Sequence, residues 1–481
     1  MPTAEEDRGP ADRAAPYQQA SLAFRAVIDA GIGELQANVS GFTDRRDRGA
    51  DFTDIASDGA DASVRLVGRG KWQWSALAYV QTRQFASGFA SIDAARTAAA
   101  ATLDQYSVPA TGVGGRIEVQ PATGEALTLR LGADVRRVEG KTQELFTYVA
   151  GSPTRRREAG GRSATLGGFV DASYRAGALT LNAGGRLDRW RITGGRLLET
   201  PLAGGAAVTD AAFADRNGWE ATGRVGAALE AGGGVTVRAA AYRGWRLPTL
   251  NELYRPFRVG ADATAANAAL APERLTGAEA GLDWAPLAGL VLRATGYWSR
   301  VDDAIANVTI ASGPGNFPGA GFVSAAGVYR QRRNLDSVEA HGLEFDARFE
   351  AGELRLSASW ALTDARVAAS GLAAPLDGLR PAQTARNQGS ATLGWARGDA
   401  GASLTARYVA PQYEDDQNAR LLADAVTLDA VARLPLAGGF AVEVRGENLF
   451  DARVEAGISG GGVVERATPR TLWIGLRYRL R

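Results

Sequence analysis

Hydrophobic and polar residues alternate along much of this chain with a period of two. In one stretch Leu127, Leu129, Leu131, Ala133 and Val135 are interleaved with Thr128, Arg130, Gly132, Asp134 and Arg136. The same alternation recurs at 179–188, 290–299, 341–350 and 472–480. A period of two places successive side chains on opposite faces of an extended strand. The pattern therefore predicts strands with one apolar and one polar face along the length of the chain.

Short and long connections between these strands also alternate. Short turns are expected at 29–32, 68–71, 121–125, 175–178, 230–234, 286–289, 350–353, 397–401 and 435–439. Long polar connections are expected near 44–60, 87–110, 140–162, 192–217, 248–272, 304–337, 365–387, 411–425 and 449–467. All short turns then lie at one end of the structure and all long loops at the other, which is typical of an outer-membrane barrel. A soluble β-sandwich has no reason to segregate connection lengths in this way.

The predicted fold is all-β, a transmembrane antiparallel β-barrel over residues 17–481, with 1–16 as a partial extracellular loop or a disordered N-terminus. The connections imply about nineteen strands, whereas single-chain bacterial barrels have even numbers. We therefore expect the sequence to be an incomplete barrel. Polar faces should line the lumen and apolar faces should meet lipid. Arg and Asp should keep to the lumen face, because a charge near the bilayer midplane costs ~2–4 kcal/mol.

Composition excludes most kinds of chemistry. The 481 residues include 54 basic and 53 acidic side chains, a net charge of +1, so a nucleic-acid binder is not indicated. The absence of cysteine excludes disulfides, Cys-ligated metals and thiol nucleophiles. His341 is the single histidine, which excludes a His-paired metal site. We expect no enzyme activity, no metal site and no cofactor, and we interpret His341, on the apolar face of its strand, as an interfacial residue.

Three charged clusters lie in the expected long loops. The run Arg155, Arg156 and Arg157, near Lys141 and Arg162, could attract an anionic ligand such as a ferric siderophore. A solvated loop, or one that pairs with lipopolysaccharide phosphates, is the preferred interpretation. Carboxylates that could hold Ca²⁺ occur at Glu414, Asp415 and Asp416 and at Asp44, Asp47, Asp51, Asp54 and Asp58. Neither group has the spacing of a dedicated calcium loop, so solvated loops are again preferred.

Three motifs in the second half of the chain resemble the signatures of TonB-dependent receptors. The first is Tyr242-Arg-Gly-Trp-Arg-Leu-Pro-Thr-Leu-Asn-Glu-Leu-Tyr254, followed by Asn267, Leu270 and Pro272-Glu273. The others are Arg445-Gly-Glu-Asn-Leu-Phe-Asp451 and Thr468-Pro-Arg470. Ala268 and Thr468 stand where the family has proline and glycine. The motifs occur in the family's order over 240–481, and the strand pattern extends the resemblance to nearly the whole chain.

This resemblance implies strands 4–22 of a 22-stranded barrel, without the first three strands, the N-terminal plug or the TonB-contacting box. The implied function is import of a scarce, bulky nutrient across the Gram-negative outer membrane. A ferric siderophore is the first expectation, and cobalamin or an oligosaccharide comes next. Some haem-uptake members use a histidine near the Pro-Thr-Leu box, and none lies between 242 and 273. The implied partners are outer-membrane lipid, lipopolysaccharide and the TonB complex, the last through the missing plug. The alternative is a passive porin-like channel.

The resemblance also indicates site residues. The expected ligand-facing residues at the mouth are Arg246, Asn251, Glu252, Tyr254, Arg255 and Arg258, although a purely structural strand end would give the same residues. The motif positions are Trp245, Pro248, Thr249, Leu250, Leu253, Asn448, Leu449 and Phe450. Pro248 should end a strand because proline cannot donate to a ladder. Asn448 should bond its own backbone where a strand gives way to a loop.

Overall fold

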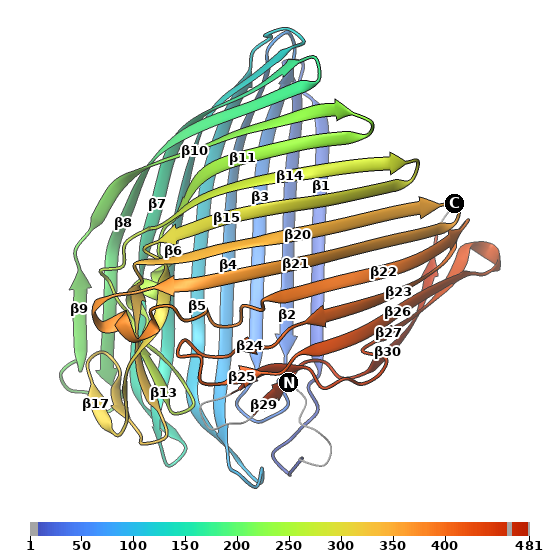
Figure 1. Ribbon diagram of the computed structural model, residues 1–481. Helices are drawn as coiled ribbons and strands as arrows, with labels where there is room; N and C mark the ends of the chain where they lie inside the picture. The colour runs from blue at the N-terminus through green and yellow to red at the C-terminus, as the bar shows by residue number, and fades with distance from the viewer. Residues whose placement is uncertain (1–7, 459–463, 480–481) are drawn as a thin grey trace.

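The computed structural model describes residues 8–458 and 464–479, and most of them form antiparallel strands (Figure 1). The wall strands are β1 (Tyr17–Asp29), β2 (Glu34–Arg46), β3 (Ile55–Arg69), β4 (Gln73–Ile92), β5 (Ala99–Gln120), β6 (Leu127–Val149), β7 (Ser152–Ala176), β8 (Leu179–Pro201), β9 (Thr209–Phe213), β10 (Arg216–Gly232), β11 (Val235–Arg246), β14 (Glu273–Leu287), β15 (Leu290–Asp302), β20 (Ser337–Ala351), β21 (Leu354–Ala368), β22 (Asn387–Arg397), β23 (Ala400–Val409), β26 (Ala425–Pro435), β27 (Phe440–Glu447) and β30 (Thr471–Tyr478).

Smaller elements lie in the connections. They are α1 (Leu250–Tyr254), β12 (Phe257–Val259), β13 (Asp262–Ala265), β16 (Ile305–Ser312), β17 (Gly315–Phe317), β18 (Gly321–Val323), β19 (Val328–Asn334), η2 (Gly371–Leu376), β24 (Gln412–Tyr413), β25 (Leu421–Leu422), η3 (Ala437–Gly439), β28 (Glu455–Ile458) and β29 (Val464–Arg466). Within the described residues, no helix is long and apolar enough to cross a membrane.

The wall is one sheet of 20 strands in which neighbours along the chain pair antiparallel. Because β9 and β10 both pair with β8, on successive lengths of it, they occupy a single position in the wall. The sheet therefore has nineteen positions, which confirms the predicted number. Among the described strands, β1 pairs only with β2 and β30 only with β27. The sheet curves strongly, and its long connections lie along the lower left and the bottom of Figure 1, away from the short turns at the top and right.

The predicted short turns are present, but three of the predicted long loops are largely strand. β4 continues to Ile92, β8 continues to Pro201, and only Ala150 and Gly151 separate β6 from β7. Both turn residues have positive φ, as a two-residue hairpin of type I′ requires. The prediction of a loop at 140–162 was wrong, because the polar residues there continue the antiparallel pairing instead of ending it.

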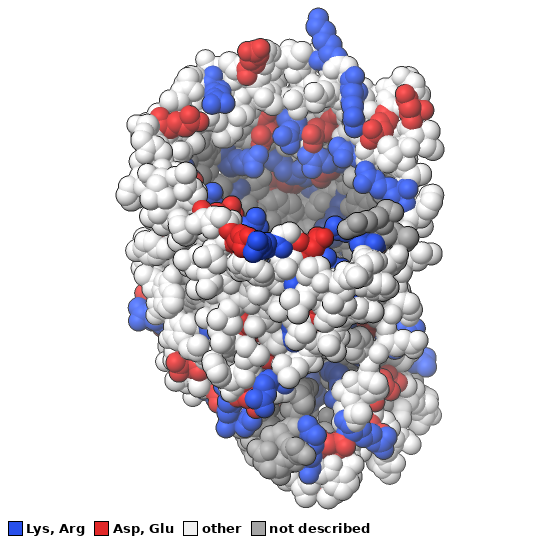
Figure 2. Space-filling view, turned by 90° about the vertical axis from the view of Figure 1, so that its right-hand side faces the viewer, with Lys and Arg blue, Asp and Glu red and all other residues white. Residues whose placement is uncertain are grey.

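The two faces of the wall differ as predicted. Leu131 pairs with Val170, and Val135 pairs with Leu166, all on the outer face. The intervening residues point into the lumen, where Arg186 bonds Asp134 at 2.6 Å and also contacts Asp188. Figure 2 shows a hollow into which basic side chains and a smaller number of acidic ones project. The alternation in the sequence is thus the alternation between lipid and lumen.

Charges are not confined to the lumen face along the whole length of each strand. Arg189 is level with Leu166 and therefore lies on the outer face, and Arg137, Arg162 and Arg243 lie on the same face by register. All lie nearer to the long-loop end than the apolar residues of their own strands. The predicted restriction of arginine to the lumen holds in the apolar band and fails above it, because the midplane penalty declines toward the interface.

The described part of the N-terminal segment, residues 8–16, lies at the long-loop end. The backbone N–H of Ala11 donates to the carbonyl of Arg96, and that of Arg13 donates to the carbonyl of Gly49. Ala11 is buried there. The segment is therefore joined to the loops that follow β2 and β4, and β1 begins at Tyr17 directly after it.

The orientation of the faces generates a stability prediction. Ala358 faces outward between Leu356 and Trp360, whereas its neighbour Ser357 faces the lumen. We expect Ala358→Arg to lower the free energy of unfolding by ~2–4 kcal/mol, and Ser357→Arg to change it by no more than ~0.5 kcal/mol. Reversible guanidinium unfolding in phospholipid vesicles measures both. Equal losses would mean that the faces are assigned incorrectly.

Candidate functional site

The mouth of the barrel is built from long connections that interlock. β12 and β13 come from the connection after β11, and β16 and β19 come from the connection after β15. Together they form a four-stranded sheet in which β13 and β19 pair in parallel. Backbone pairing therefore holds residues of these two connections in fixed register across the opening, so the surface of the mouth is ordered.

A short helix, α1, follows the end of β11. The strand ends at Arg246, two residues before the buried Pro248, as predicted from the missing proline N–H. Thr249 caps the helix: its hydroxyl accepts from the Glu252 N–H at 3.2 Å, and the Glu252 carboxylate accepts from the Thr249 N–H at 2.7 Å. The helix was not predicted, although Thr249-x-x-Glu252 is a capping-box pattern that signals it.

The motif residues after the helix cap are buried. Tyr254 and Leu253 are 2% and 1% exposed. The Tyr254 ring stacks on Phe213 with centroids 5.1 Å apart. A Cβ at Gly195 would lie 2.3 Å from the Tyr254 ring, so only glycine fits below it. Leu270 and the lumen-facing Ile192 complete this packing, which fixes the helix against β7 and β8.

Arg255 anchors the same loop through a buried ion network. Glu144 of β6 is fully buried and accepts from Arg255 Nε at 2.7 Å and from Arg157 Nη1 at 3.2 Å. Arg157 also bonds Glu199 of β8 at 2.6 Å and donates to the carbonyl of Pro256 at 3.1 Å. Two arginines and two glutamates thus balance in charge. This arrangement ties the loop to three wall strands, because a buried charge is tolerated only with partners.

Two further arginines hold the helix. Arg246 pairs with Glu252 at 3.0 Å and with Glu273. Arg332 of β19 donates to the carbonyls of Asn251 and Arg255 at the end of α1. Burial lowers the pKa of Arg332 to about 10, so the guanidinium still carries its charge at neutral pH. A cation beside the C-terminal carbonyls of a helix is stabilising.

The structure brings some of the predicted site residues together and separates others. Arg246 contacts Glu252, and Arg255 shares Glu144 with Arg157. Tyr254 is buried, whereas Asn251 and Arg258 are exposed in the mouth. Arg258 donates to the carbonyls of Ala320 and Phe322, both at 2.6 Å. The cluster is therefore mainly the anchor of a loop. Its exposed members are Asn251, Arg258 and Arg246, and Arg246 is paired with Glu252 and Glu273.

The run Arg155–Arg157 does not form the predicted basic loop patch. All three residues lie in β7, where alternate side chains point to opposite faces, and Arg157 is neutralised as described above. Arg156 is 6.0 Å from the Tyr106 ring centroid. The neighbouring cations are also paired: Lys141 lies 3.6 Å from Glu158, and Arg162 lies 2.9 Å from Glu139. Strand geometry divides the run.

A cavity of about 660 Å³ opens among the connections at the mouth. Its apolar part comes from Ala304, Ile305, Leu335, Val338, Val367 and Leu376. Its charged and polar part comes from Asp262, Arg330, Arg380, Gln383, Glu414, Asp415, Asp416, Arg420 and Glu465. Five separate connections contribute to this wall. The cavity was not predicted, because the residues that form it are far apart along the chain.

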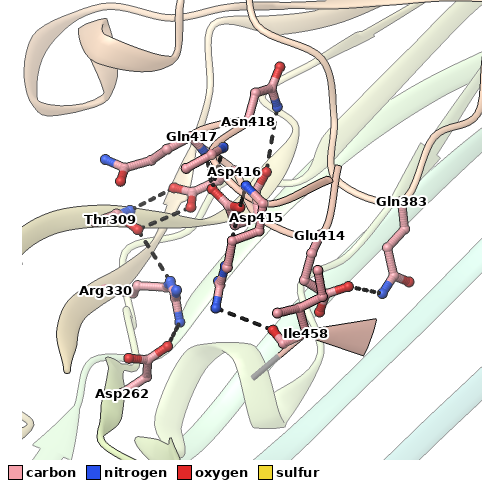
Figure 3. Close-up of polar contacts among 12 residues, drawn as sticks. Asp262, Thr309, Arg330, Gln383, Glu414, Asp415, Asp416, Gln417, Asn418 and Ile458 are labelled. Atoms are coloured by element: carbon pink, nitrogen blue, oxygen red, sulfur yellow. Dashed lines mark hydrogen bonds and ion pairs between the residues drawn. The ribbon is translucent and has the colours of Figure 1, made fainter. Parts of the chain in front are cut away.

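A network of polar contacts holds the charged wall in place (Figure 3). Asp262 of β13 pairs with Arg330 of β19 at 2.9 Å, and Arg330 donates to the Thr309 hydroxyl of β16 at 3.2 Å. Asp416, from the connection after β23, accepts from the N–H and hydroxyl of Thr309 at 2.9 and 3.0 Å. These contacts join three connections, so the cavity wall is a single bonded unit.

Asp415 closes its own loop. Its carboxylate accepts from the backbone N–H groups of Gln417, Ala419 and Arg420, and Arg420 Nε lies 3.3 Å from it. Burial alone raises the pKa of Asp415, but these hydrogen bonds outweigh that effect and hold the pKa below its ordinary value of 3.8. Glu414 accepts instead from Gln383 at 3.0 Å.

Glu414, Asp415 and Asp416 thus each bond different partners and do not converge on one point. In the other acidic series, Asp44 pairs with Arg46, Asp58 with Arg45 and Asp51 with Arg13. Across residues 8–458 and 464–479, no group of three or more His, Asp or Glu side chains could hold a metal ion. His341 lies on the outer face opposite Trp298 and Asp364.

The second motif forms the turn after β27. Asn448 has φ of 48°, and its side-chain oxygen accepts from the Ala452 N–H at 2.8 Å. Its side-chain nitrogen donates to the carbonyl of Ala452 at 2.9 Å, so the side chain bonds the backbone four residues further on and not its own backbone as expected. Leu449 is half-buried and Phe450 is 80% exposed. The motif therefore starts the last long connection.

Comparison with known proteins identifies a related group. A sequence model described as TonB dependent receptor-like, beta-barrel matches residues 5–449. A search of curated proteins gives no match.

Three similar solved structures share the fold at low sequence identity. The ferric yersiniabactin uptake receptor FyuA from Yersinia pestis has 14% identity and a TM-score of 0.73, covering 96% of this chain and 71% of that one. The copper transporter OprC has 17% identity and a TM-score of 0.72, with the same coverage. The ferric-catecholate import receptor Fiu from K12 E. coli has 12% identity and a TM-score of 0.73, covering 98% and 75%.

The ion network generates the first prediction for the mouth. Glu144→Gln leaves Arg157 and Arg255 without their shared carboxylate, and breaking a buried pair costs about 3–5 kcal/mol. We expect hydrogen exchange at the Leu253 and Arg255 amides, which bond the carbonyls of Thr249 and Asn251, to accelerate correspondingly. In the control Glu230→Gln, an exposed pair with Arg175 is lost at a cost below ~1 kcal/mol. Unchanged exchange in Glu144→Gln would contradict the anchoring role.

The second prediction concerns pH. A carboxyl whose folded pKa is depressed stabilises the fold above its ordinary pKa, and this stabilisation is lost as pH falls through the folded value. We therefore expect the Asp415 loop to open progressively below pH 3.8. Hydrogen exchange at the Ala419 and Arg420 amides measures it. Asp415→Asn should remove this pH dependence, and its persistence in that variant would assign it to another group.

Proposed function

We propose that this chain, which belongs to the TonB-dependent receptor family through its β-barrel domain, forms the wall and mouth of an outer-membrane transporter that imports a ferric siderophore. The cavity of about 660 Å³ at the mouth is the observation that carries this proposal. Sites for small organic ligands are usually clefts of about 300–1,000 Å³ with mostly apolar walls and a few placed polar groups.

The cavity wall suits a bulky chelate better than a small sugar or a bare ion. Ile305, Val338 and Val367 offer apolar surface. Arg380 and Gln383 contact Asp364 and Glu414, and each side chain has further N–H groups that can donate to a ligand. Asp262 and Asp415 are already paired with Arg330 and Arg420. A ligand with both apolar and oxygen-rich faces satisfies such a wall, and a ferric siderophore has both. In the proposed mechanism the chain makes or breaks no bond in the ligand.

The structural neighbours support the same ligand class. They include a ferric yersiniabactin uptake receptor, a ferric-catecholate import receptor, a ferric citrate transporter and a copper transporter. In the family, transport is coupled to TonB through a plug inside the barrel. We propose the same coupling for the protein to which this wall belongs, with lipid and lipopolysaccharide around it. The loop anchored by Tyr254 and Arg255 then supports the mouth, while Asn251 and Arg258 face the ligand.

The proposal is tested by ligand binding. Tryptophan fluorescence of the full chain in detergent is titrated with ferric catecholate, ferric hydroxamate, ferric citrate, cobalamin and a linear oligosaccharide. We expect one ferric siderophore class to bind, and Arg380→Gln to weaken it about tenfold through loss of a charged hydrogen bond. Arg355→Gln, at the opposite rim, is the control. Binding of cobalamin or the oligosaccharide alone would overturn the substrate class.

A passive channel is the alternative function, and dependence on energy separates the two. In cells that express the whole protein, uptake of the radiolabelled ferric siderophore should stop when TonB is deleted. A passive channel would continue to admit ligand at an unchanged rate. This result would reject active transport while leaving the binding measurement intact.

A further inference from the structure

The cavity at the mouth has more acidic than basic side chains in its wall. Five carboxylates line it, and they belong to Asp262, Glu414, Asp415, Asp416 and Glu465. Three guanidinium groups line it, and they belong to Arg330, Arg380 and Arg420. The wall therefore has a surplus of negative charge, and the arrangement of the ion pairs decides where this surplus lies.

Two of the carboxylates are compensated within the wall itself. Asp262 lies 2.9 Å from Arg330, and Asp415 lies 3.3 Å from Arg420. Both carboxylates are buried and also accept hydrogen bonds from the backbone, Asp262 from the Val328 N–H at 3.0 Å. These two pairs thus shape the wall and leave no free charge for a ligand.

The third arginine of the wall also has a carboxylate partner. Arg380 lies 3.3 Å from Asp364, which is outside the cavity. Arg366 and Arg386 contact the same carboxylate, and neither of them lines the cavity. The positive charge near Asp364 is therefore concentrated outside the cavity, with Arg380 at its border.

Glu414, Asp416 and Glu465 carry the surplus negative charge. Glu414 accepts from the neutral amide of Gln383, and Asp416 accepts from Thr309 (Figure 3). In the part of the chain that the structure describes, no Lys or Arg side chain lies within ion-pair distance of these three carboxylates. Glu414 is half-buried and Glu465 is exposed, so both are open to a ligand.

Glu414 and Glu465 converge on one point of the wall. Gly457 of β28 pairs with Glu465 of β29 and lines the cavity. A Cβ on Gly457 would lie 3.6 Å from Glu465 Oε2 and 3.8 Å from Glu414 Oε1. Because glycine has no side chain, the space between the two carboxylates stays open toward the cavity.

This pair of carboxylates suits an organic cation better than a metal ion. Within residues 8–458 and 464–479, no third His, Asp or Glu joins a group that could hold a metal. An ammonium group needs only two or three acceptors, which it contacts by charge-assisted hydrogen bonds. The nearby apolar wall from Ile305, Leu335 and Val367 lowers the local dielectric and strengthens such contacts.

We propose that Glu414 and Glu465 bind a protonated amine of the imported ligand, so that the siderophore selected by this cavity is a ferric hydroxamate with a free ammonium group. This inference rests on the proposed function, because it concerns the same cavity. It adds which chelate the cavity accepts and which two side chains decide the choice.

The charge of the chelate explains the preference for hydroxamate. Each hydroxamate group binds iron as a monoanion, so a tris-hydroxamate neutralises the ferric ion and an added ammonium makes the complex cationic. Each catecholate group binds as a dianion, so a ferric tris-catecholate is strongly anionic. A cleft with a surplus of one charge attracts ligands of the opposite charge and repels those of its own.

The test compares two chelates that differ in one charge. A linear ferric tris-hydroxamate that ends in a primary amine, and its N-acetylated derivative, are titrated against the full chain in detergent with tryptophan fluorescence as the readout. We expect the amine form to bind at least about tenfold more tightly, because acetylation removes a hydrogen bond between two charged groups. A ferric tris-catecholate should bind more weakly than either.

Charge-neutral variants locate the preference. The double variant Glu414→Gln, Glu465→Gln retains the shape of both side chains, and it should bind the amine form only as tightly as the acetylated form. Affinity for the acetylated form should not change. The control is Asp51→Asn, Asp210→Asn, which removes two exposed carboxylates, paired with Arg13 and Arg196, from the same end of the barrel. It should retain the full preference.

The outcomes separate this inference from the proposed function. Equal binding of the two hydroxamates, or tighter binding of an anionic ferric chelate, would overturn the inference and leave siderophore import in place. A preference that persists in the Gln variant, or disappears in the control, would also overturn it. Binding of no ferric chelate would overturn both. The comparison of the two hydroxamates needs only the unmodified chain, so it decides the matter even if the Gln variant does not fold.

Discussion

Hydrogen bonding of the backbone in lipid is the constraint on which this structure depends. Within the hydrocarbon layer water offers no partner, so every wall strand must bond its neighbours on both sides. The antiparallel ladder of nineteen positions meets this requirement from β2 to β27, and alternate side chains are then divided between lipid and lumen. The period of two in the sequence follows from that ladder. The same ladder continues beyond the apolar band of the wall, because β6 and β7 remain paired as far as Val149 and Ser152.

The mouth solves a different problem, because its connections have no continuous ladder to hold them. Buried charge takes that role: Glu144 joins two arginines from different segments, and Asp262, Arg330 and Asp416 join three connections through Thr309. Such contacts depend on geometry and are costly to break. These contacts give the cavity wall a defined shape before a ligand binds. Binding then requires less loss of conformational entropy in the loops that form the wall.

The architecture could be predicted from the sequence because it follows from local rules, and much of the site could not. Alternation and turn spacing predicted the strand count and the short turns, and Pro248 follows the end of its strand as expected. The run Arg155–Arg157 was misassigned because polar residues in a strand above the membrane resemble a loop. The buried state of Tyr254 depends on Gly195 and Phe213. These contacts have no periodic or short-range signal in the sequence.

The positions of the motif residues bear on how specificity can arise in this barrel. Tyr254 and Arg255 lie at the end of α1 and contact the wall. A substitution of either residue therefore changes the mouth by moving α1. The cavity is lined by the connections after β11, β15, β21, β23 and β27, and none of the four charged residues of the Glu144 network is among its lining residues. One anchor can therefore support different cavity walls, since the ion network at Glu144 requires nothing of the side chains that face the ligand. The side chains that face the cavity can therefore change without removing a partner from the ion network at Glu144.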